Sequence, residues 1–257
     1  MSVKLPISGG VIAKNEGDRI ERCVRSLVEV CAEVIVLDSG SSDDTVAKAR
    51  TAGARVEHQD WLGFAAQKNL LLTRISQPWA LMIDADEWLG EGAAEALREL
   101  FASGRIESAD IWRLERRTHF LGKTFRFGGW SREPVGRLFR ADIRYQPLQV
   151  HEKHDARGRR RARVRARLEH DTARSYEEYR GKLERYARLF AEQKYGEGLR
   201  ASALAPLIHA LAYALKNGLL RGGFLDGPNA WRYHYLHTRY VWQKYRHLRA
   251  LQRKPPT

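Results

Sequence analysis

The first third of the chain alternates short apolar segments with segments that carry apolar residues at helical spacing. A continuous β-branched run such as residues 34–37 is typical of a strand buried on both faces of a sheet. Strands that alternate with helices in short units predict a parallel, doubly wound α/β sheet. We expect strands over residues 11–13, 34–37, 54–57 and 79–83, and helices over residues 18–30, 45–52 and 63–74.

The pattern changes after residue 110, where further strands are expected over residues 111–114 and 137–140. Arginine then occupies alternate positions between residues 159 and 168, which predicts a strand with one arginine face and one mostly small apolar face. From residue 175 onward the pattern is helical, with two aromatic stripes that we interpret as helix-packing faces, lipid contact being the alternative. The first stripe is Tyr176, Tyr179, Leu183, Tyr186 and Phe190, and the second is Trp231, Tyr235, Thr238, Trp242 and Tyr245.

The composition is that of a globular chain. Of the 257 residues, 43% are hydrophobic, which is enough for a substantial core. The two cysteines rule out a disulfide scaffold, and reduced thiols indicate cytosolic exposure. The first twenty residues lack the apolar stretch of a signal peptide. The apolar run over residues 204–215 contains Pro206 and His209 and is shorter than the ~20 residues of a membrane span, so we expect no transmembrane helix.

Charge is distributed unevenly along the chain. The formal net charge is +14, but residues 1–110 carry a net charge of −6 and residues 111–257 a net charge of +20. An acidic half joined to a strongly basic half indicates two tasks. We expect the basic half to meet an anionic partner, which is a nucleic acid, a phosphorylated substrate or an anionic lipid.

Polar residues follow three of the expected strands. Ligands of doubly wound sheets bind beyond the carboxyl ends of the strands, so we expect Asn15, Asp38 and Asp84 to mark a binding site. Asp84 and Asp86 are separated by one residue, a spacing that suits a hard divalent cation whose remaining ligands are phosphate oxygens and water. The alternative is that each cluster is only a turn or a helix cap.

Four motifs occur in order near the N-terminus: VIAKNE at 11–16, VIVLDSGSSD at 34–43, GFAAQKN at 63–69 and IDADEW at 83–88. Together they resemble the signatures of family 2 glycosyltransferases with the GT-A fold, and the lipopolysaccharide-core β-glycosyltransferase branch in particular. The resemblance covers most of the chain. It continues through RLFR at 137–140, VHE at 150–152, LEH at 168–170, YEEY at 176–179 and GGFLDG at 222–227.

The resemblance implies an α/β chain with the GT-A fold, a doubly wound, Rossmann-like mixed sheet, followed by a basic and mainly helical C-terminal region. Residues 1–110 would form the half of the GT-A domain that binds the nucleotide sugar. Residues 111–172 would form the acceptor-side half, and residues 173–257 the helical basic region.

The activity that the resemblance implies is transfer of a sugar from a nucleotide-diphosphate donor, such as a UDP-sugar, with inversion at the anomeric carbon. Asp38 would bind the nucleobase, and Asp84 the ribose. Lys68 would approach the nucleotide. The residues assigned to the donor in this way are Asn15, Glu16, Asp38, Ser39, Lys68 and Asp84.

The resemblance also assigns a metal site and a general base. Asp86 would hold Mg²⁺ or Mn²⁺ on the diphosphate, and His170 would complete the metal shell. A divalent cation suits this chemistry because it neutralises the charge that develops on the diphosphate leaving group. Glu152 is the candidate base that would activate the acceptor hydroxyl, with a solvated glutamate in a basic loop as the alternative.

The acceptor expected from the resemblance is a lipid-linked or lipopolysaccharide-core glycan. A phosphorylated core would account for the basic second half of the chain. We therefore expect a cytoplasmic enzyme that is peripheral on the anionic inner face of a bacterial inner membrane. The run over residues 204–220 would lie at that interface, unless it packs as an internal helix.

Two other functions compete with transfer of a sugar. A nucleic-acid-binding protein would explain the basic half, but the acidic first half and the lack of a known nucleic-acid-binding motif argue against this interpretation. A nucleotidyltransferase would also use carboxylates at strand ends and a metal. Such an enzyme usually has a glycine-rich basic loop after its first strand, whereas Gly9 and Gly10 precede residues 11–13 here. We expect no nucleic-acid partner.

Overall fold

The computed structural model describes residues 3–128, 132–146 and 153–253. The chain forms two units. Unit 1 comprises Met1–Arg117 and Glu133–His170, and unit 2 comprises Thr118–Arg132 and Asp171–Thr257. The acidic N-terminal segment therefore lies in unit 1, and the long C-terminal helices lie in unit 2.

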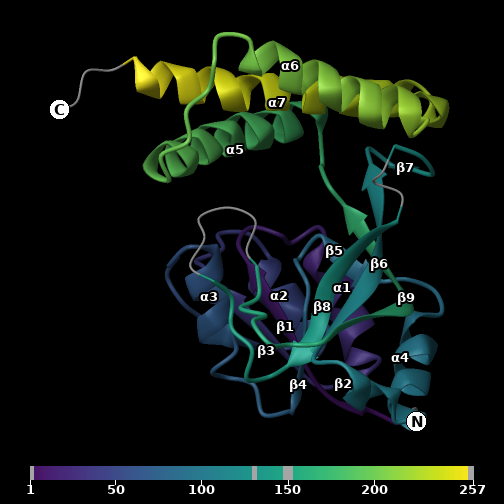
Figure 1. Ribbon diagram of the computed structural model, residues 1–257. Coiled ribbons are helices and arrows are strands. Elements are labelled where there is room, and N and C mark those ends of the chain that lie inside the picture. The colour runs from purple at the N-terminus through teal and green to yellow at the C-terminus, as the bar shows by residue number, and fades with distance from the viewer. Residues whose placement is uncertain (1–2, 129–131, 147–152, 254–257) are drawn as a thin grey trace. The chain divides into compact units, whose positions relative to one another are not determined.

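One mixed sheet contains the nine strands found among the described residues (Figure 1). Their order is β3-β2-β1-β4-β8-β6-β9-β5, and β7 pairs with β6. Strands β1 to β4 are parallel to one another. Strand β8 pairs in antiparallel fashion with both β4 and β6. The strands are β1 (Leu5–Ala13), β2 (Cys31–Asp38), β3 (Arg55–His58), β4 (Trp79–Met82), β5 (Glu87–Leu89), β6 (Ile111–Phe120), β7 (Lys123–Thr124), β8 (Glu133–Arg140) and β9 (Arg161–Asp171).

Helices of unit 1 follow the parallel strands and cover both faces of the sheet. Apolar residues of α1 and α4 pack in one hydrophobic cluster, and α3 packs in a second cluster with β4 and β8. The predicted alternation of strands and helices in the first ninety residues is confirmed. The helices are α1 (Ile20–Val28), α2 (Thr45–Thr51), α3 (Phe64–Leu71), α4 (Ala93–Ala102) and the 3-10 turn η1 (Arg105–Ser108).

Close packing around the central strand requires a glycine in β1. A Cβ atom on Gly10 would clash with Met82 of β4 and would lie 2.7 Å from Cδ2 of Leu71 in α3. The absence of a side chain thus lets α3 approach the sheet. This approach brings the helix that carries Lys68 to the carboxyl edge of the parallel strands.

The predicted arginine strand is confirmed as β9. Arg163 and Arg165 are exposed, whereas Val164, Ala166 and Leu168 are buried against the core of unit 1. The period of two observed in the sequence therefore reflects a sheet with one charged and one apolar face.

Unit 2 is mainly helical, as expected for the C-terminal region. Its core is built from aromatic side chains, among which Phe120, Tyr179 and Tyr233 are in mutual ring contact. Among the described residues, no helix combines the length and the apolar character needed to cross a membrane. The helices are α5 (Tyr176–Gly196), α6 (Ala205–Tyr213), the π-helical segment η2 (Ala214–Leu220), the 3-10 turn η3 (Gly223–Asp226) and α7 (Pro228–Gln252).

The two aromatic stripes of the sequence differ in how far they are buried. Tyr179 and Leu183 of the first stripe are buried between helices, as expected. The second stripe was expected to pack as well. Its Tyr245 does, with its ring stacked on that of His209, but the interpretation is wrong for Trp231 and Tyr235, which are 59% and 60% exposed. Helix α7 instead buries Tyr233, Leu236, His237 and Tyr240, which share another face of the same helix.

Burial of His237 makes the stability of unit 2 depend on pH. Nε2 of His237 is hydrogen-bonded to the hydroxyl of Tyr179 at 2.7 Å. Burial of the imidazole, together with the nearby His234 and Lys244, lowers the pKa of His237 from 6.5 to about 3. The unfolded chain therefore binds one more proton than the folded chain between these values. As the pH falls below 6.5, the free energy of unfolding therefore decreases by about 1.4 kcal/mol per pH unit.

We predict that His237→Gln will flatten this dependence. In urea titrations at pH 7, 6 and 5, the free energy of unfolding of the wild type should fall more steeply than that of the variant. The control is His58→Gln, which changes an exposed histidine in unit 1. Parallel pH curves for the wild type and His237→Gln would contradict the prediction.

Candidate active site

The polar residues predicted as a binding site lie at one edge of the sheet in unit 1. Strands β1, β2 and β4 are parallel, with Ala13 paired to Asp38 and Gly10 paired to Met82. The segments that follow these strands therefore leave the sheet on the same side. They carry Asn15 with Glu16, Ser39 and Asp84.

The carboxylate of Asp38 is buried and fixes the turn after β2. Its Oδ2 accepts from the backbone N–H of Gly40 at 3.0 Å and of Ser41 at 2.9 Å, and the Ser41 hydroxyl donates to Oδ1. The neighbouring Ser39 hydroxyl accepts from Nε2 of Gln67 in α3 at 3.0 Å. The turn proposed as the alternative for this cluster is thus present, and it holds Ser39 at the strand end.

The segment after β1 is tied to the same turn. Asn15 has a φ of 54°, a left-handed conformation that asparagine tolerates better than most residues. Its Oδ1 accepts from the N–H of Ser42 at 2.8 Å, and its own N–H donates to the Ser41 hydroxyl at 2.9 Å. The N–H of Glu16 donates to the Thr45 hydroxyl at 2.8 Å. These bonds tie Asn15 to the turn that follows β2 and Glu16 to the start of α2.

Asp84 stands between two cations. Lys68 Nζ donates to its Oδ1 at 2.9 Å, and the guanidinium of Arg137 in β8 donates to its Oδ2 at 2.5 Å. Burial raises the pKa of Asp84, but Arg137 and Lys68 outweigh that effect and hold the pKa well below its usual range. The carboxylate is therefore ionised, and 37% of its side chain is exposed.

A second carboxylate lies behind Asp84. Glu87 is fully buried, and its Oε1 lies 2.7 Å from Arg137 and 3.3 Å from Arg116. Its Oε2 accepts from the N–H of Asp84 at 3.1 Å. Glu87 and Arg137 were not predicted as site residues, although both belong to the motifs IDADEW and RLFR. A charged residue inside an apolar strand pattern is the signal that marks Arg137.

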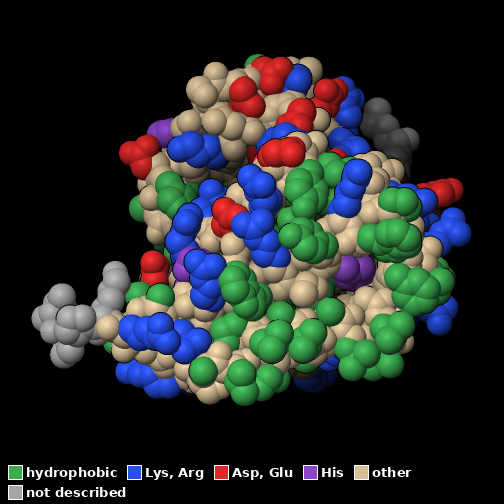
Figure 2. Space-filling view, turned by 90° about the horizontal axis from the view of Figure 1, so that it is seen from above, with side chains coloured by type: hydrophobic (Ala, Val, Ile, Leu, Met, Phe, Trp, Pro, Cys, Tyr) green, Lys and Arg blue, Asp and Glu red, His purple; other side chains and the backbone are tan. Residues whose placement is uncertain are grey.

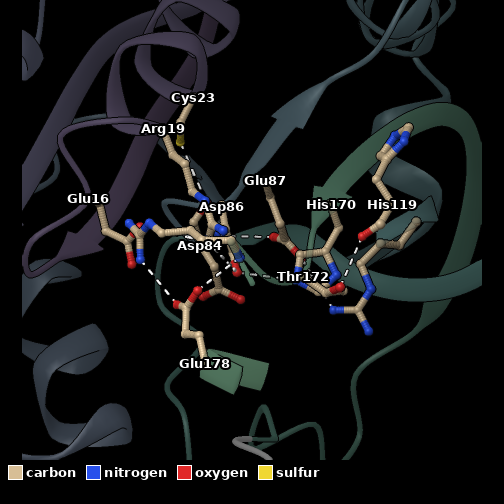
Figure 3. Close-up of polar contacts among 12 residues, drawn as sticks. Glu16, Arg19, Cys23, Asp84, Asp86, Glu87, His119, His170, Thr172 and Glu178 are labelled. Carbon is tan, nitrogen blue, oxygen red and sulfur yellow. Dashed lines mark hydrogen bonds and ion pairs between the residues drawn. The ribbon is translucent and has the colours of Figure 1, made fainter. Parts of the chain in front are cut away.

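Asp86 and His170 come together although 84 positions separate them in the sequence. Strand β5 pairs with β9 and places Glu87 opposite His170, so that Nε2 of His170 lies 3.4 Å from Oδ2 of Asp86. Figure 3 shows the side chains of Asp84, Asp86, Glu87 and His170 grouped in this place. Arg19 of the segment before α1 lies 4.0 Å from the same oxygen of Asp86.

This pair fits the expected cation. Among the described residues, no group of three or more His, Cys, Asp or Glu side chains is placed to hold a metal ion. Mg²⁺ is commonly held by one or two protein ligands together with substrate phosphates and water, so a pair is sufficient. The buried Nδ1 of His170 has no hydrogen-bond partner within the described part of the chain. Carboxylate and imidazole also form a donor set suited to Mn²⁺.

Glu152, the residue predicted to be the general base, lies outside the described residues, as does His151. Nearby Tyr145 is described, and its backbone forms two hydrogen bonds with the side-chain amide of Asn69 in α3, at 2.7 and 2.9 Å. These bonds anchor the chain before residue 147 to the helix that carries Lys68.

Comparison with known proteins supports a single family. Residues 8–164, more than half of the chain, match the sequence profile described as Glycosyl transferase family 2. The lipopolysaccharide core biosynthesis glycosyltransferase LpsC of Rhizobium meliloti (strain 1021) is 32% identical over 274 residues, covering 99% of this chain and 97% of LpsC. An uncharacterized glycosyltransferase of Rickettsia bellii (strain RML369-C) is 43% identical over 97 residues, 38% of this chain and 33% of that protein.

A solved structure is similar to the fold over nearly the whole chain. The crystal structure of S. aureus TarS 1-349 in complex with UDP-GlcNAc has a TM-score of 0.51, covers 97% of this chain and 92% of TarS, and is 14% identical in sequence. The predicted fold class, a GT-A-type mixed sheet followed by a helical C-terminal region, is confirmed. The profile match and the full-length similarity to LpsC agree with the motifs at the strand ends, and the chain belongs to glycosyltransferase family 2.

Proposed function

We propose that this glycosyltransferase moves a sugar from a UDP-sugar to a lipid-linked or lipopolysaccharide-core glycan, with inversion at the anomeric carbon. The observation that carries the proposal is the convergence of Asp38, Asp84 and Asp86 at the carboxyl edge of three parallel strands. The similarity to LpsC, named for lipopolysaccharide core biosynthesis, supports this class of acceptor.

In this proposal the nucleotide lies along the edge formed by β1, β2 and β4. Asn15, Glu16, Asp38 and Ser39 surround the base, where a buried carboxylate accepts hydrogen bonds from base N–H groups. Asp84 is ionised and partly exposed, so it can accept hydrogen bonds from the ribose hydroxyls. Lys68 supplies positive charge beside it.

Asp86 and His170 would hold Mg²⁺ or Mn²⁺ beside the diphosphate. When bound, the cation neutralises the charge that develops on the leaving group. Arg19 adds positive charge 4.0 Å from the Asp86 oxygen that His170 also approaches. Glu152 would accept the proton of the acceptor hydroxyl as that oxygen attacks the anomeric carbon.

The location that fits this acceptor is the cytoplasmic face of the bacterial inner membrane, with the protein attached peripherally to anionic lipid. The strongly basic second half of the chain supports this location, because phosphates of the acceptor and of lipid headgroups are both anionic.

The proposed reaction is tested by a screen of nucleotide sugars with lipopolysaccharide-core acceptors, each donor with and without Mg²⁺ or Mn²⁺. We predict transfer from a UDP-sugar that requires the cation, and Asp86→Asn should reduce turnover at least about 100-fold, since even outer partners of a metal site contribute roughly 10–100-fold. The matched control is Asp60→Asn, which alters a side chain that is 92% exposed. Full activity in excess chelator would contradict the proposed requirement for a divalent cation.

We predict that Asp38→Ala will weaken UDP binding by roughly 10–100-fold, the value of a hydrogen bond to a charged group. Isothermal titration calorimetry measures the affinity, and urea unfolding measures the accompanying loss of stability. Because Asp38 also fixes its own turn, Ser41→Ala serves as the control: it removes the hydroxyl that donates to Asp38 and accepts from the N–H of Asn15, while keeping the carboxylate. Equal losses of affinity in both variants would assign Asp38 a structural role only.

Arg137→Lys should impair the site while keeping its charge. Lysine cannot reproduce the guanidinium that bridges Asp84 and Glu87, so we expect a loss of about 1.5–3 kcal/mol in unfolding free energy and weaker UDP binding. The control is Arg140→Lys in the same strand, where the arginine pairs with the exposed Glu107. A UDP affinity of Arg137→Lys equal to that of the wild type would show that the bridge does not position the donor site.

A further inference from the structure

Unit 2 exposes a continuous row of large apolar side chains. Seven leucine and isoleucine residues of α6, η2 and the turn before them are each between 52% and 74% exposed. Their spacing of three or four positions places them along one side of the helical segment, while Pro206, Ala210 and Asn217 on the other side are buried. The seven residues are Leu204, Leu207, Ile208, Leu211, Leu215, Leu219 and Leu220.

Aromatic side chains from η3 and α7 extend this row. Phe224, Leu225, Trp231 and Tyr235 are 46–60% exposed. The indole N–H of Trp231 donates to the carbonyl of Phe224 at 2.7 Å, which fixes the ring against η3. We call the seven aliphatic residues together with these four residues the apolar face. Monomeric proteins seldom expose an apolar patch of this extent unless it contacts a partner or a membrane.

Basic residues accompany the apolar face, and acidic residues are missing. Among residues 198–257, Asp226 is the single acidic residue in the sequence. Its carboxylate is buried and accepts from the backbone N–H groups of Arg126 and Phe127. Figure 2, which looks down on this side of the molecule, shows hydrophobic side chains gathered together with Lys and Arg among them. The exposed basic residues of this stretch are Arg200, Lys216, Arg221, Arg232, Arg246 and Arg253.

We propose that the apolar face of unit 2 docks onto an anionic lipid bilayer and inserts its leucine side chains below the headgroups. The three layers of such an interface are present in one surface: aliphatic side chains for the acyl region, Trp231 and Tyr235 for the headgroup level, and Lys or Arg for lipid phosphates. The segment formed by α6 and η2 is shorter than the ~20 residues of a membrane span, and no helix among the described residues could cross a membrane. Attachment in the plane of the interface fits both observations.

Charge favours a bilayer over a second copy of the chain. A symmetric dimer through this surface would place its basic residues opposite one another, with no exposed acidic residue from the same stretch to pair with them. Anionic lipid provides both the apolar phase and the negative charge. The proposal specifies the surface that attaches the glycosyltransferase, and it does not depend on the identity of donor or acceptor.

Flotation of the full-length protein with liposomes tests the proposal in the absence of nucleotide sugars, so its failure would leave the proposed transfer reaction untouched. We expect the protein to float with vesicles of phosphatidylglycerol and phosphatidylethanolamine. Binding to pure phosphatidylcholine vesicles should be weak. High salt should weaken the binding to anionic vesicles, because screening acts on the basic residues.

Two groups of variants separate this surface from the overall charge of the chain. Replacement of Lys216, Arg221 and Arg232 by Gln should weaken binding roughly 100-fold, since each basic residue near an anionic surface contributes about fivefold. Replacement of the exposed Arg161, Arg163 and Arg165 of β9 removes the same charge from unit 1 and is the matched control. Equal losses in both triple variants would overturn the proposal.

The aliphatic residues are tested in the same assay. Ile208→Gln, Leu211→Gln and Leu215→Gln together should abolish flotation, because these side chains would then no longer enter the acyl region. All three are exposed, so circular dichroism should show an unchanged fold. The control is Trp61→Gln with Leu62→Gln, which replaces exposed apolar residues of unit 1. Wild-type flotation of the Ile208, Leu211 and Leu215 variant would contradict insertion of the apolar face.

A fluorescent label reports insertion directly. Cys23 and Cys31 are buried, so an environment-sensitive dye can be attached selectively to Leu211→Cys. Its emission should shift to shorter wavelength on addition of anionic vesicles, whereas the dye on the exposed Ser103→Cys at the end of α4 should not respond. A protein that shows no shift, or that sediments as a dimer through Leu211 in place of binding vesicles, would refute the proposal.

Discussion

The guanidinium of Arg137 is the interaction on which the site depends. Asp84 follows β4 and Glu87 begins β5, and both carboxylates contact the same guanidinium; Glu87 is fully buried, and two negative charges so close together are unfavourable without a cation between them. Arg137 comes from β8, the first antiparallel strand beside the parallel ones. The acidic edge of the sheet is therefore not stabilised by the N-terminal strands alone. The antiparallel part of the sheet supplies the charge that makes the acidic edge stable.

Much of this edge could be predicted from the sequence, because its elements are local. The strands that end before Asn15, at Asp38 and before Asp84 each produce a continuous apolar run, and parallel strands bring such ends to one side of a sheet. The alternation of arginine with apolar residues in β9 could be predicted in the same way, because side chains alternate between the two faces of any strand. A hydrophobic pattern within one strand therefore predicts the folded structure correctly when no contact with a distant segment overrides it.

Features that depend on distant contacts could not be predicted in this way. The bond between Arg137 and Asp84 joins residues 53 positions apart, and no local period indicates it. The short strand β5, which contains only Glu87–Leu89, is defined by its pairing with β9. The second aromatic stripe has helical spacing, but spacing does not tell which face of α7 meets α5; burial of Tyr233 and Tyr240 decides it and leaves Trp231 outside. The place of Glu152 stays a prediction.

The pairing of β5 with β9 has a consequence for synthesis of the chain. The ribosome releases the acidic segment at residues 84–87 long before it releases Arg137 or His170, so for a time the nascent chain holds these carboxylates with only Lys68 and Arg19 as partners. Contacts between segments so far apart in sequence form late during folding. The last strand of unit 1 to emerge thus brings His170 to Asp86 and adds its apolar face to the core.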